Sequence, residues 1–135
     1  MKFPKGYDAD KYTALLWKRG VSDLKVAELV IEERESFGLG LFFVHGSLQK
    51  MIAANICRQT SSIPPWRYDL TKLAKLANIP LTKEQKDFCK ILNFYHKEGP
   101  YLVEREHSKP SKEEARNYVK SAKRLAASLP NPLAK

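Results

Sequence analysis

The chain has 135 residues, the length of one ordinary domain, and 43% of them are hydrophobic, so a disordered or low-complexity chain is excluded. Its 24 Lys and Arg exceed its 15 Asp and Glu, for a formal net charge of +9, which permits acidic partners but equally fits a solvated lysine-rich surface. The two cysteines form no C-x-x-C pair, and neither an apolar leader nor a membrane-length apolar run is present, so we expect a cytoplasmic protein with no membrane-spanning segment.

The first predicted helix begins at a cap on Asp8 or Asp10 and runs to about Glu33. Gly20 lies inside this helix, where it costs about 1 kcal/mol relative to alanine, and a close contact with another helix would explain its presence. The apolar residues that recur at helical spacing are Leu15, Leu16, Val21, Leu24, Ala27, Leu29, Val30 and Ile31.

The next segment, F-G-L-G-L-F-F-V-H-G (37–46), holds three glycines and continues without interruption into S-L-Q-K-M-I-A-A-N-I-C-R (47–58). A strand is disfavoured because consecutive positions are apolar, so that the alternation fails. Two adjacent apolar stripes at helical spacing instead predict a central helix that is covered on most sides. We expect Gly38, Gly40 and Gly46 to allow close approach of another helix, either within the chain or from a second copy.

The paired prolines of S-S-I-P-P-W predict a loop over residues 60–66. Three further helices follow, and each has a recognisable start or stop. A short helix from Leu70 ends near Asn78, the next begins at the capping box of Thr82 and Gln85 and ends at Gly99-Pro100, and the last begins at the capping box of Ser111 and Glu114.

The pattern therefore predicts an all-α fold: an up-and-down antiparallel four-helix bundle with one extra short helix. We expect a single domain over residues 1–135, with a core from about 8 to 129 between a short N-terminal arm and a frayed C-terminal tail.

No motif for a cofactor or a metal is present. The glycines fail the G-x-G-x-x-G dinucleotide fingerprint because Phe43 occupies its third position. His45, His96 and His107 have no metal-ligand spacing, and neither cysteine lies one helical turn from a histidine. We therefore expect no cofactor and no metal, with His45 in the core or at an interface.

Four short motifs follow one another in an order and spacing that resemble HEPN domains, which are small helical bundles. They are R-G-V-S-D-L-K-V-A (19–27), F-F-V-H-G-S-L-Q-K-M-I-A-A (42–54), Y-D-L-T-K-L (68–73) and L-N-F-Y (92–95). The resemblance covers roughly Lys11 to Leu129. The positions that match the family's motifs are Asp23, Leu24, Phe42, Lys50, Ala54, Asp69, Leu70, Leu73, Leu92, Asn93, Tyr95 and Tyr101.

The departures from the family's motifs bear on catalysis. Many HEPN proteins are metal-independent ribonucleases that use an arginine and a histidine separated by four to six residues, a pair suited to moving a proton and stabilising a phosphorane. None of the three histidines here has an arginine at that spacing, and Tyr68 stands where the family has a histidine. A non-catalytic protein is therefore expected; the alternative is a divergent HEPN ribonuclease or toxin that uses Arg105 with His107, or Tyr101 in a modified role.

The resemblance implies a binding subunit of the class encoded beside a minimal nucleotidyltransferase, in some cases as a toxin–antitoxin pair. Such a domain forms a homodimer through apolar helix faces and binds a nucleotide or RNA near the dimer cleft. The candidate ligand-binding residues are Lys50, Tyr68, Asp69, Asn93 and Tyr101.

Each candidate also has a purely structural explanation. Lys50 interrupts an apolar helix and needs an acid, so a salt bridge with Asp23 or Asp69 is an alternative. Asp69 is equally placed to cap the short helix. The remaining alternatives are core aromatic positions for Tyr68 and Tyr101, and stabilisation by Asn93 of the loop after its helix.

A further alternative function is a generic RNA-binding or scaffold protein whose basic faces contact phosphate. The sequence argues against it mildly, because we find no cluster of aromatic and basic residues that would share one exposed face.

Overall fold

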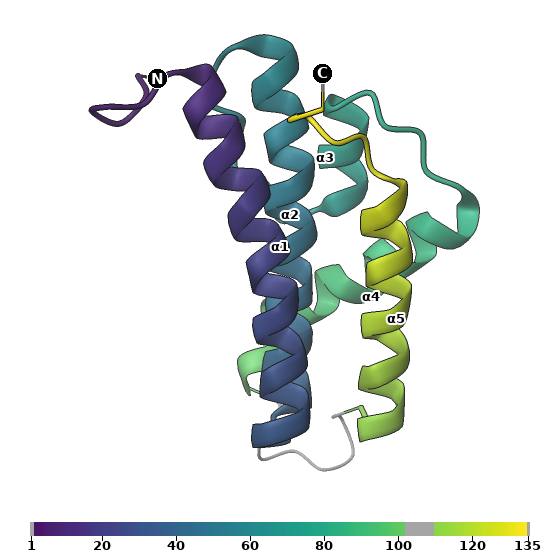
Figure 1. Cartoon of the computed structure of the whole chain (residues 1–135). Helices are drawn as coiled ribbons and strands as arrows, with labels where there is room; N and C mark the ends of the chain where they lie inside the picture. Colours follow the sequence, from purple (N-terminus) through teal and green to yellow (C-terminus); the bar gives the residue numbers. More distant parts are fainter. Residues whose placement is uncertain (1, 102–109, 135) are drawn as a thin grey trace.

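A computed structural model describes residues 2–101 and 110–134, and these residues form helices and connections with no strand (Figure 1). The elements are α1 (Ala9–Arg34), α2 (Phe37–Thr60), α3 (Leu70–Leu76), α4 (Lys83–Glu98), the 3₁₀ turn η1 (Gly99–Tyr101) and α5 (Lys112–Ser128). The predicted all-α class is confirmed; the finer up-and-down four-helix arrangement stays a prediction. None of the helices in the described ranges is long and apolar enough to cross a membrane.

Helix α2 lies at the centre and contacts every other helix (Figure 1). From Ser47 to Cys57, every residue except Lys50 is buried, as expected of a helix covered on most sides. Only Glu35 and Ser36 separate α1 from α2, so the two helices form an antiparallel hairpin, and α5 packs against both of them. Val21 and Leu29, two of the apolar residues that recur at helical spacing in α1, are exposed.

The predicted helix starts are formed by side-chain caps. Of the two candidate residues for the first cap, Asp8 accepts a hydrogen bond from the backbone N–H of Lys11 at 2.9 Å. Both capping boxes are present, at Ser111 with Glu114 and at Thr82 with Gln85. Each cap satisfies backbone N–H groups that have no partner within the helix and contributes about 1 kcal/mol.

Glycines allow α1 and α2 to pack closely. A Cβ on Gly20 would lie only 2.8 Å from the carbonyl oxygen of Ser47 on α2, and the Ser47 hydroxyl donates to the carbonyl of Gly20 at 2.6 Å. A Cβ on Gly40 would overlap the side chain of Ile31. The close approach expected at Gly20 and Gly40 is thus found within a single chain.

Gly38 and Gly46, the other two glycines of the apolar segment, differ in the space around them. A Cβ on Gly38 would overlap the backbone carbonyl of Gly99, and a Cβ on Gly99 would overlap the carbonyl of Gly38. A Cβ on Gly46, in contrast, would have only Nζ of Lys50 near it, at 4.0 Å. Gly38 and Gly99 therefore let α2 meet η1 backbone to backbone, whereas Gly46 has no such role.

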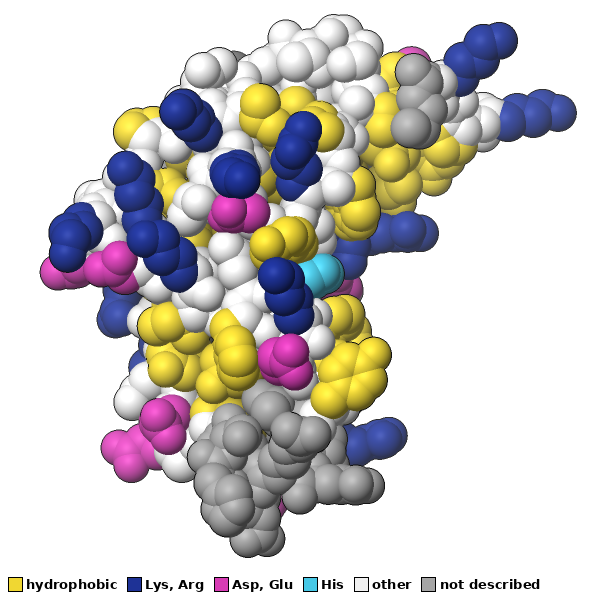
Figure 2. Space-filling view, turned by 180° about the vertical axis from the view of Figure 1, so that it is seen from behind, with side chains coloured by type: hydrophobic (Ala, Val, Ile, Leu, Met, Phe, Trp, Pro, Cys, Tyr) yellow, Lys and Arg dark blue, Asp and Glu magenta, His cyan; other side chains and the backbone are white. Residues whose placement is uncertain are grey.

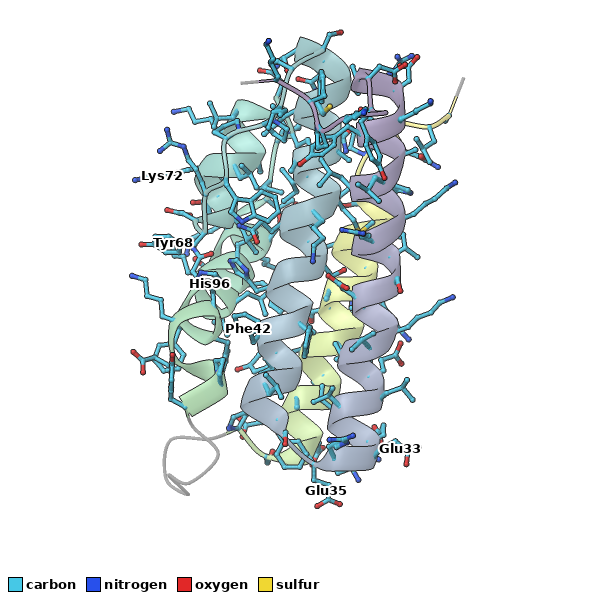
Figure 3. The ribbon with its side chains drawn as sticks, turned by 90° about the vertical axis from the view of Figure 1, so that its left-hand side faces the viewer. Glu33, Glu35, Phe42, Tyr68, Lys72 and His96 are labelled. Atoms are coloured by element: carbon cyan, nitrogen blue, oxygen red, sulfur yellow. The ribbon has the colours of Figure 1, made fainter. Side chains whose placement is uncertain are left out.

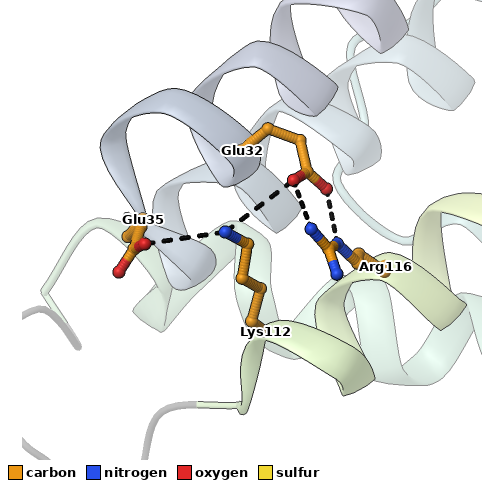
Figure 4. Close-up of polar contacts among 4 residues, drawn as sticks. All are labelled: Glu32, Glu35, Lys112 and Arg116. Carbon is orange, nitrogen blue, oxygen red and sulfur yellow. Dashed lines mark hydrogen bonds and ion pairs between the residues drawn. The ribbon is translucent and has the colours of Figure 1, made fainter.

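Ion pairs line the exposed edge between α1 and α5 (Figure 4). Arg116 donates two hydrogen bonds to the Glu32 carboxylate, each at 2.6 Å, and Lys112 lies 3.8 Å from Glu32 and 3.5 Å from Glu35. The hydrogen bond from Arg116 holds the pKa of Glu32 below its ordinary value. Because exposed pairs contribute little, the buried side chains beneath them dominate this contact; on α5 these are Ala115, Val119, Ala122 and Leu125.

Candidate functional site

Lys50 serves a structural role in this fold. Its ammonium group forms a salt bridge with the Asp23 carboxylate on α1, and both side chains are partly buried. Of the two partners considered from the sequence, the structure therefore selects Asp23. This pairing satisfies the one charge in an otherwise buried stretch of α2, and it directs Lys50 toward α1 and not toward Asp69.

Asp69 and Asn93 form one hydrogen-bonded cluster that joins the start of α3 to α4. Oδ1 of Asp69 accepts from the backbone N–H of Thr71 at 3.1 Å, from its hydroxyl at 2.7 Å and from the Asn93 amide at 3.0 Å. The Asn93 carbonyl in turn accepts from the backbone N–H of Leu70 at 3.1 Å. Asn93 thus supports α3, not the loop after its own helix, and the capping role of Asp69 is confirmed.

The Asp69 carboxylate is held in its charged form. Burial raises the pKa of Asp69, but the hydrogen bonds from Thr71 and Asn93 outweigh it, and the net pKa lies below the ordinary value. A carboxylate that accepts several hydrogen bonds is stabilised as the anion. Asp69 is therefore a fixed positioning group that orients Asn93 and the start of α3.

Tyr68 belongs to a stack of rings on the face shared by α2 and α4 (Figure 3). Its ring lies nearly parallel to that of His96, with centroids 5.8 Å apart and an interplanar angle of 8°. His96 is similarly related to Phe42, at 5.8 Å and 12°. Nζ of Lys97 lies 4.4 Å from the centre of the Tyr68 ring, within cation–π distance. We call Phe42, His96 and Tyr68 the aromatic stack.

This arrangement excludes one alternative left open by the sequence and corrects one expectation. Tyr68 is 43% exposed and Tyr101, on η1, is 75% exposed, so neither is a core aromatic. The expectation that aromatic and basic residues do not share an exposed face is wrong, since Tyr68 and Lys97 are in contact.

Helix α2 holds the segment that carries Tyr68. The fully buried His45 lies 2.6 Å, through Nε2, from the backbone carbonyl of Tyr68, and the Gln49 amide donates to the carbonyl of Arg67 at 2.8 Å. His45 and Gln49 are one helical turn apart, so they present their polar atoms on the same side of α2. Two consecutive carbonyls are therefore fixed before any ligand arrives.

The two histidines of this region are in contact, and the pKa of each is lowered, which favours the neutral ring. The rings of His45 and His96 have centroids 4.5 Å apart. Burial lowers the pKa of His45 to about 4. Burial also lowers the pKa of His96, and the charge of Lys97 adds to this effect. Both shifts favour the neutral rings, which can stack with each other and with neighbouring aromatic groups.

Sequence reasoning missed His96 as a member of the site. A signal was present, because His96 lies three residues after Asn93 and residues at this spacing share one face of a helix. The structure brings together Tyr68, Asp69 and Asn93, adds His96, and pairs Lys50 with Asp23 instead. Tyr101 is exposed on η1.

The alternative catalytic pair, Arg105 with His107, lies outside the described residues. Within the ranges that the structure covers, no three His, Cys, Asp or Glu side chains lie close enough to hold a metal ion. Cys57 and Cys89 are buried free thiols, and burial raises the pKa of Cys89 to about 12.

Comparison with known proteins bears on the family. No curated protein and no solved structure matches the chain. The family model described as HEPN domain matches residues 13–130, a range that includes α2, α3, α4 and the aromatic stack and nearly coincides with the resemblance found from the short motifs. The chain therefore belongs to the HEPN domain family.

Proposed function

We propose that this chain is a non-catalytic binding subunit that holds a nucleotide or nucleic-acid substrate for a minimal nucleotidyltransferase partner, as in a toxin–antitoxin pair. Membership of the HEPN domain family supports a nucleic-acid-related function. The observation that carries the proposal is Tyr68, an exposed ring backed by His96 with the ammonium of Lys97 beside it. Aromatic rings that stack with bases, next to cations that contact phosphate, are the usual elements of such sites.

The candidate residues take different roles in this proposal. Tyr68 contacts the base, and Lys97 moves from the ring to the phosphate when the base arrives. Asp69 and Asn93 position the start of α3, whereas Lys50 is assigned to the structural pair with Asp23. Tyr101, exposed on η1 directly after the last turn of α4, which carries His96 and Lys97, provides a further contact.

Replacing Tyr68 with alanine is expected to weaken binding of single-stranded RNA or nucleotide by about 1–3 kcal/mol per stacked base, or roughly 5- to 150-fold in Kd. Tyr68→Phe retains the ring and should bind nearly as the unmodified chain does. Tyr7→Ala is the matched control, because Tyr7 is 39% exposed on the N-terminal segment and Tyr68 is 43% exposed. Fluorescence anisotropy measures all three variants, and equal affinities for Tyr68→Ala and Tyr7→Ala would contradict the stacking role.

The partner is tested by co-purification. If a neighbouring reading frame encodes a small nucleotidyltransferase, we expect the two proteins to be recovered together from co-expression. A gene with no such neighbour, or a neighbour that does not bind, would contradict the proposed subunit role.

A homodimer is part of this proposal. Exposed apolar side chains on α1, namely Val21, Val26 and Leu29, support it. Light scattering should give twice the monomer mass, and a clean monomer at micromolar concentration would contradict it.

A divergent ribonuclease is the second candidate, and His96 is the observation that favours it. A partly exposed imidazole with a lowered pKa can accept the proton of a 2′-hydroxyl, and the adjacent Lys97 can stabilise the phosphorane. Labelled RNA incubated with the unmodified chain should stay intact. Cleavage that is abolished by His96→Ala, Arg105→Ala or His107→Ala would overturn the non-catalytic proposal.

A further inference from the structure

A groove of about 490 Å³ lies between α3 and α4. Its apolar lining comes from Ile79, Pro80 and Leu81, in the connection between the two helices. Its polar lining includes four lysines, Lys72 and Lys75 from α3 and Lys86 and Lys90 from α4. We call this the lysine groove. The spacing of three or four residues within each pair places both lysines on one side of their helix.

The charge of the lysine groove is not balanced by acidic side chains among the described residues. No acidic residue lines it, and none of its four lysines forms a salt bridge within residues 2–101 and 110–134. On the α1–α5 edge, by contrast, Lys112 and Lys123 both pair with glutamates. Figure 2 shows lysine and arginine side chains gathered on the side of the molecule that α3 and α4 form, with fewer acidic side chains among them. Four neighbouring cations repel one another until a polyanion binds.

The lysine groove and the aromatic stack are joined by one short, fixed segment. Thr71 and Lys72, which line the groove, follow Tyr68 by three and four residues. Asp69 holds the backbone and the hydroxyl of Thr71, and His45 holds the carbonyl of Tyr68. Figure 3 shows Lys72, Tyr68, His96 and Phe42 following one another along one side of the molecule. The two surfaces are therefore set relative to each other before binding, which lowers the entropic cost of a ligand that spans both.

We propose that the lysine groove binds the phosphate backbone of a single-stranded nucleic acid whose adjacent base stacks on Tyr68. This inference rests on the proposed function and names its substrate class. A mononucleotide carries all its phosphates on one sugar, whereas a single strand presents one phosphate per nucleotide, so a strand can offer separate phosphates to the lysines of α3 and of α4 while one of its bases stacks on Tyr68. A duplex keeps its bases paired and unavailable to Tyr68. Trp66, 61% exposed two residues before Tyr68, offers a second ring for the same strand.

The test compares two variants with equal net charge. The groove variant carries Lys72→Gln, Lys75→Gln, Lys86→Gln and Lys90→Gln, and the control carries Lys2→Gln, Lys5→Gln, Lys18→Gln and Lys25→Gln at exposed positions on the N-terminal arm and α1. The probe is a labelled, unstructured RNA of roughly 12 nucleotides. We expect the groove variant to raise Kd about 10- to 100-fold, and the control variant to raise it less than about threefold.

Salt dependence provides a second readout. Each phosphate neutralised on a single strand contributes about 0.7 to the slope of log K against log salt concentration, so loss of four lysines should reduce the slope by up to about 3. A variant with arginine at the same four positions should keep both affinity and slope. Circular dichroism and thermal unfolding confirm that each variant is folded.

The outcomes distinguish a failure of the groove assignment from a failure of the proposed function. If the unmodified chain binds neither RNA nor nucleotide, the proposed function fails and this inference fails with it. If Tyr68→Ala weakens binding but the groove and control variants behave alike, the groove assignment is overturned and the function stands. If ATP displaces the labelled RNA as effectively as unlabelled RNA of the probe's length does, the single-strand assignment is overturned. It is also overturned if duplex RNA binds as tightly as the single-stranded probe.

Discussion

Replacing Gly38 with alanine is expected to lower the free energy of unfolding by about 1–3 kcal/mol, although alanine is the better helix former. The new Cβ would overlap the carbonyl of Gly99. Because both groups are backbone, no flexible side chain can move aside, and α2 and η1 must separate. Urea unfolding should show a lower midpoint with an unchanged m-value.

Gly46→Ala is the matched control, since it makes the same substitution in the same helix. The new Cβ on residue 46 would have only Nζ of Lys50 near it, at 4.0 Å, so the gain in helix propensity should stabilise the fold by up to about 1 kcal/mol. Gly99→Ala should reproduce the loss seen with Gly38→Ala, because each Cβ meets the carbonyl of the other residue. Equal stabilities for Gly38→Ala and Gly46→Ala would show that the backbone contact is not required.

Lowering the pH from 7 to 4 is expected to cost about 3 kcal/mol of stability through His45 alone, since each pKa unit corresponds to about 1.36 kcal/mol. The pKa of His45 is about 4 in the folded chain, because the ring is buried, and 6.5 is its ordinary value. Between these values the unfolded chain binds a proton that the folded chain does not, so the stability is complete above pH 6.5 and falls as the pH drops toward 4. Urea unfolding at several pH values measures the slope.

His45→Gln isolates this effect. Glutamine keeps an N–H that can donate to the carbonyl of Tyr68 but does not titrate. The variant should be less stable than the unmodified chain at pH 7. Its free energy of unfolding should, however, depend much less on pH between pH 4 and 6.5. His96→Gln is the comparison. Because His96 is only partly buried, this substitution should remove a smaller part of the slope of unfolding free energy against pH. An unchanged slope in His45→Gln would contradict the assignment.

The features that were predictable from the sequence depend on residues close together in the chain. The capping boxes at Thr82 and Ser111 need only a partner three residues away. The burial of α2 follows from two apolar stripes that leave little of its surface polar. The Asp69 cap likewise requires only the backbone of Thr71.

The features that were not predictable depend on packing between distant segments. Nothing in the composition around Gly38 indicates that its partner is Gly99, because backbone contacts leave no residue-type pattern. The stack of Phe42, Tyr68 and His96 comes from three separate segments of the chain. The spacing of His96 from Asn93 places both on one face of α4, but it does not indicate which rings meet His96 there. The sequence named Asp23 as one of two partners for Lys50, but only the fold selects between them.

The linkage of the helices along the chain has a consequence for folding. Two residues connect α1 to α2, so their contacts close a short loop, whereas Arg116 meets Glu32 across a separation of 84 positions. Because closing a longer loop costs more entropy, we expect the α1–α2 hairpin to form early and α5 to dock last. In native-state hydrogen exchange, the amides of α5 should therefore exchange through openings that leave α2 protected.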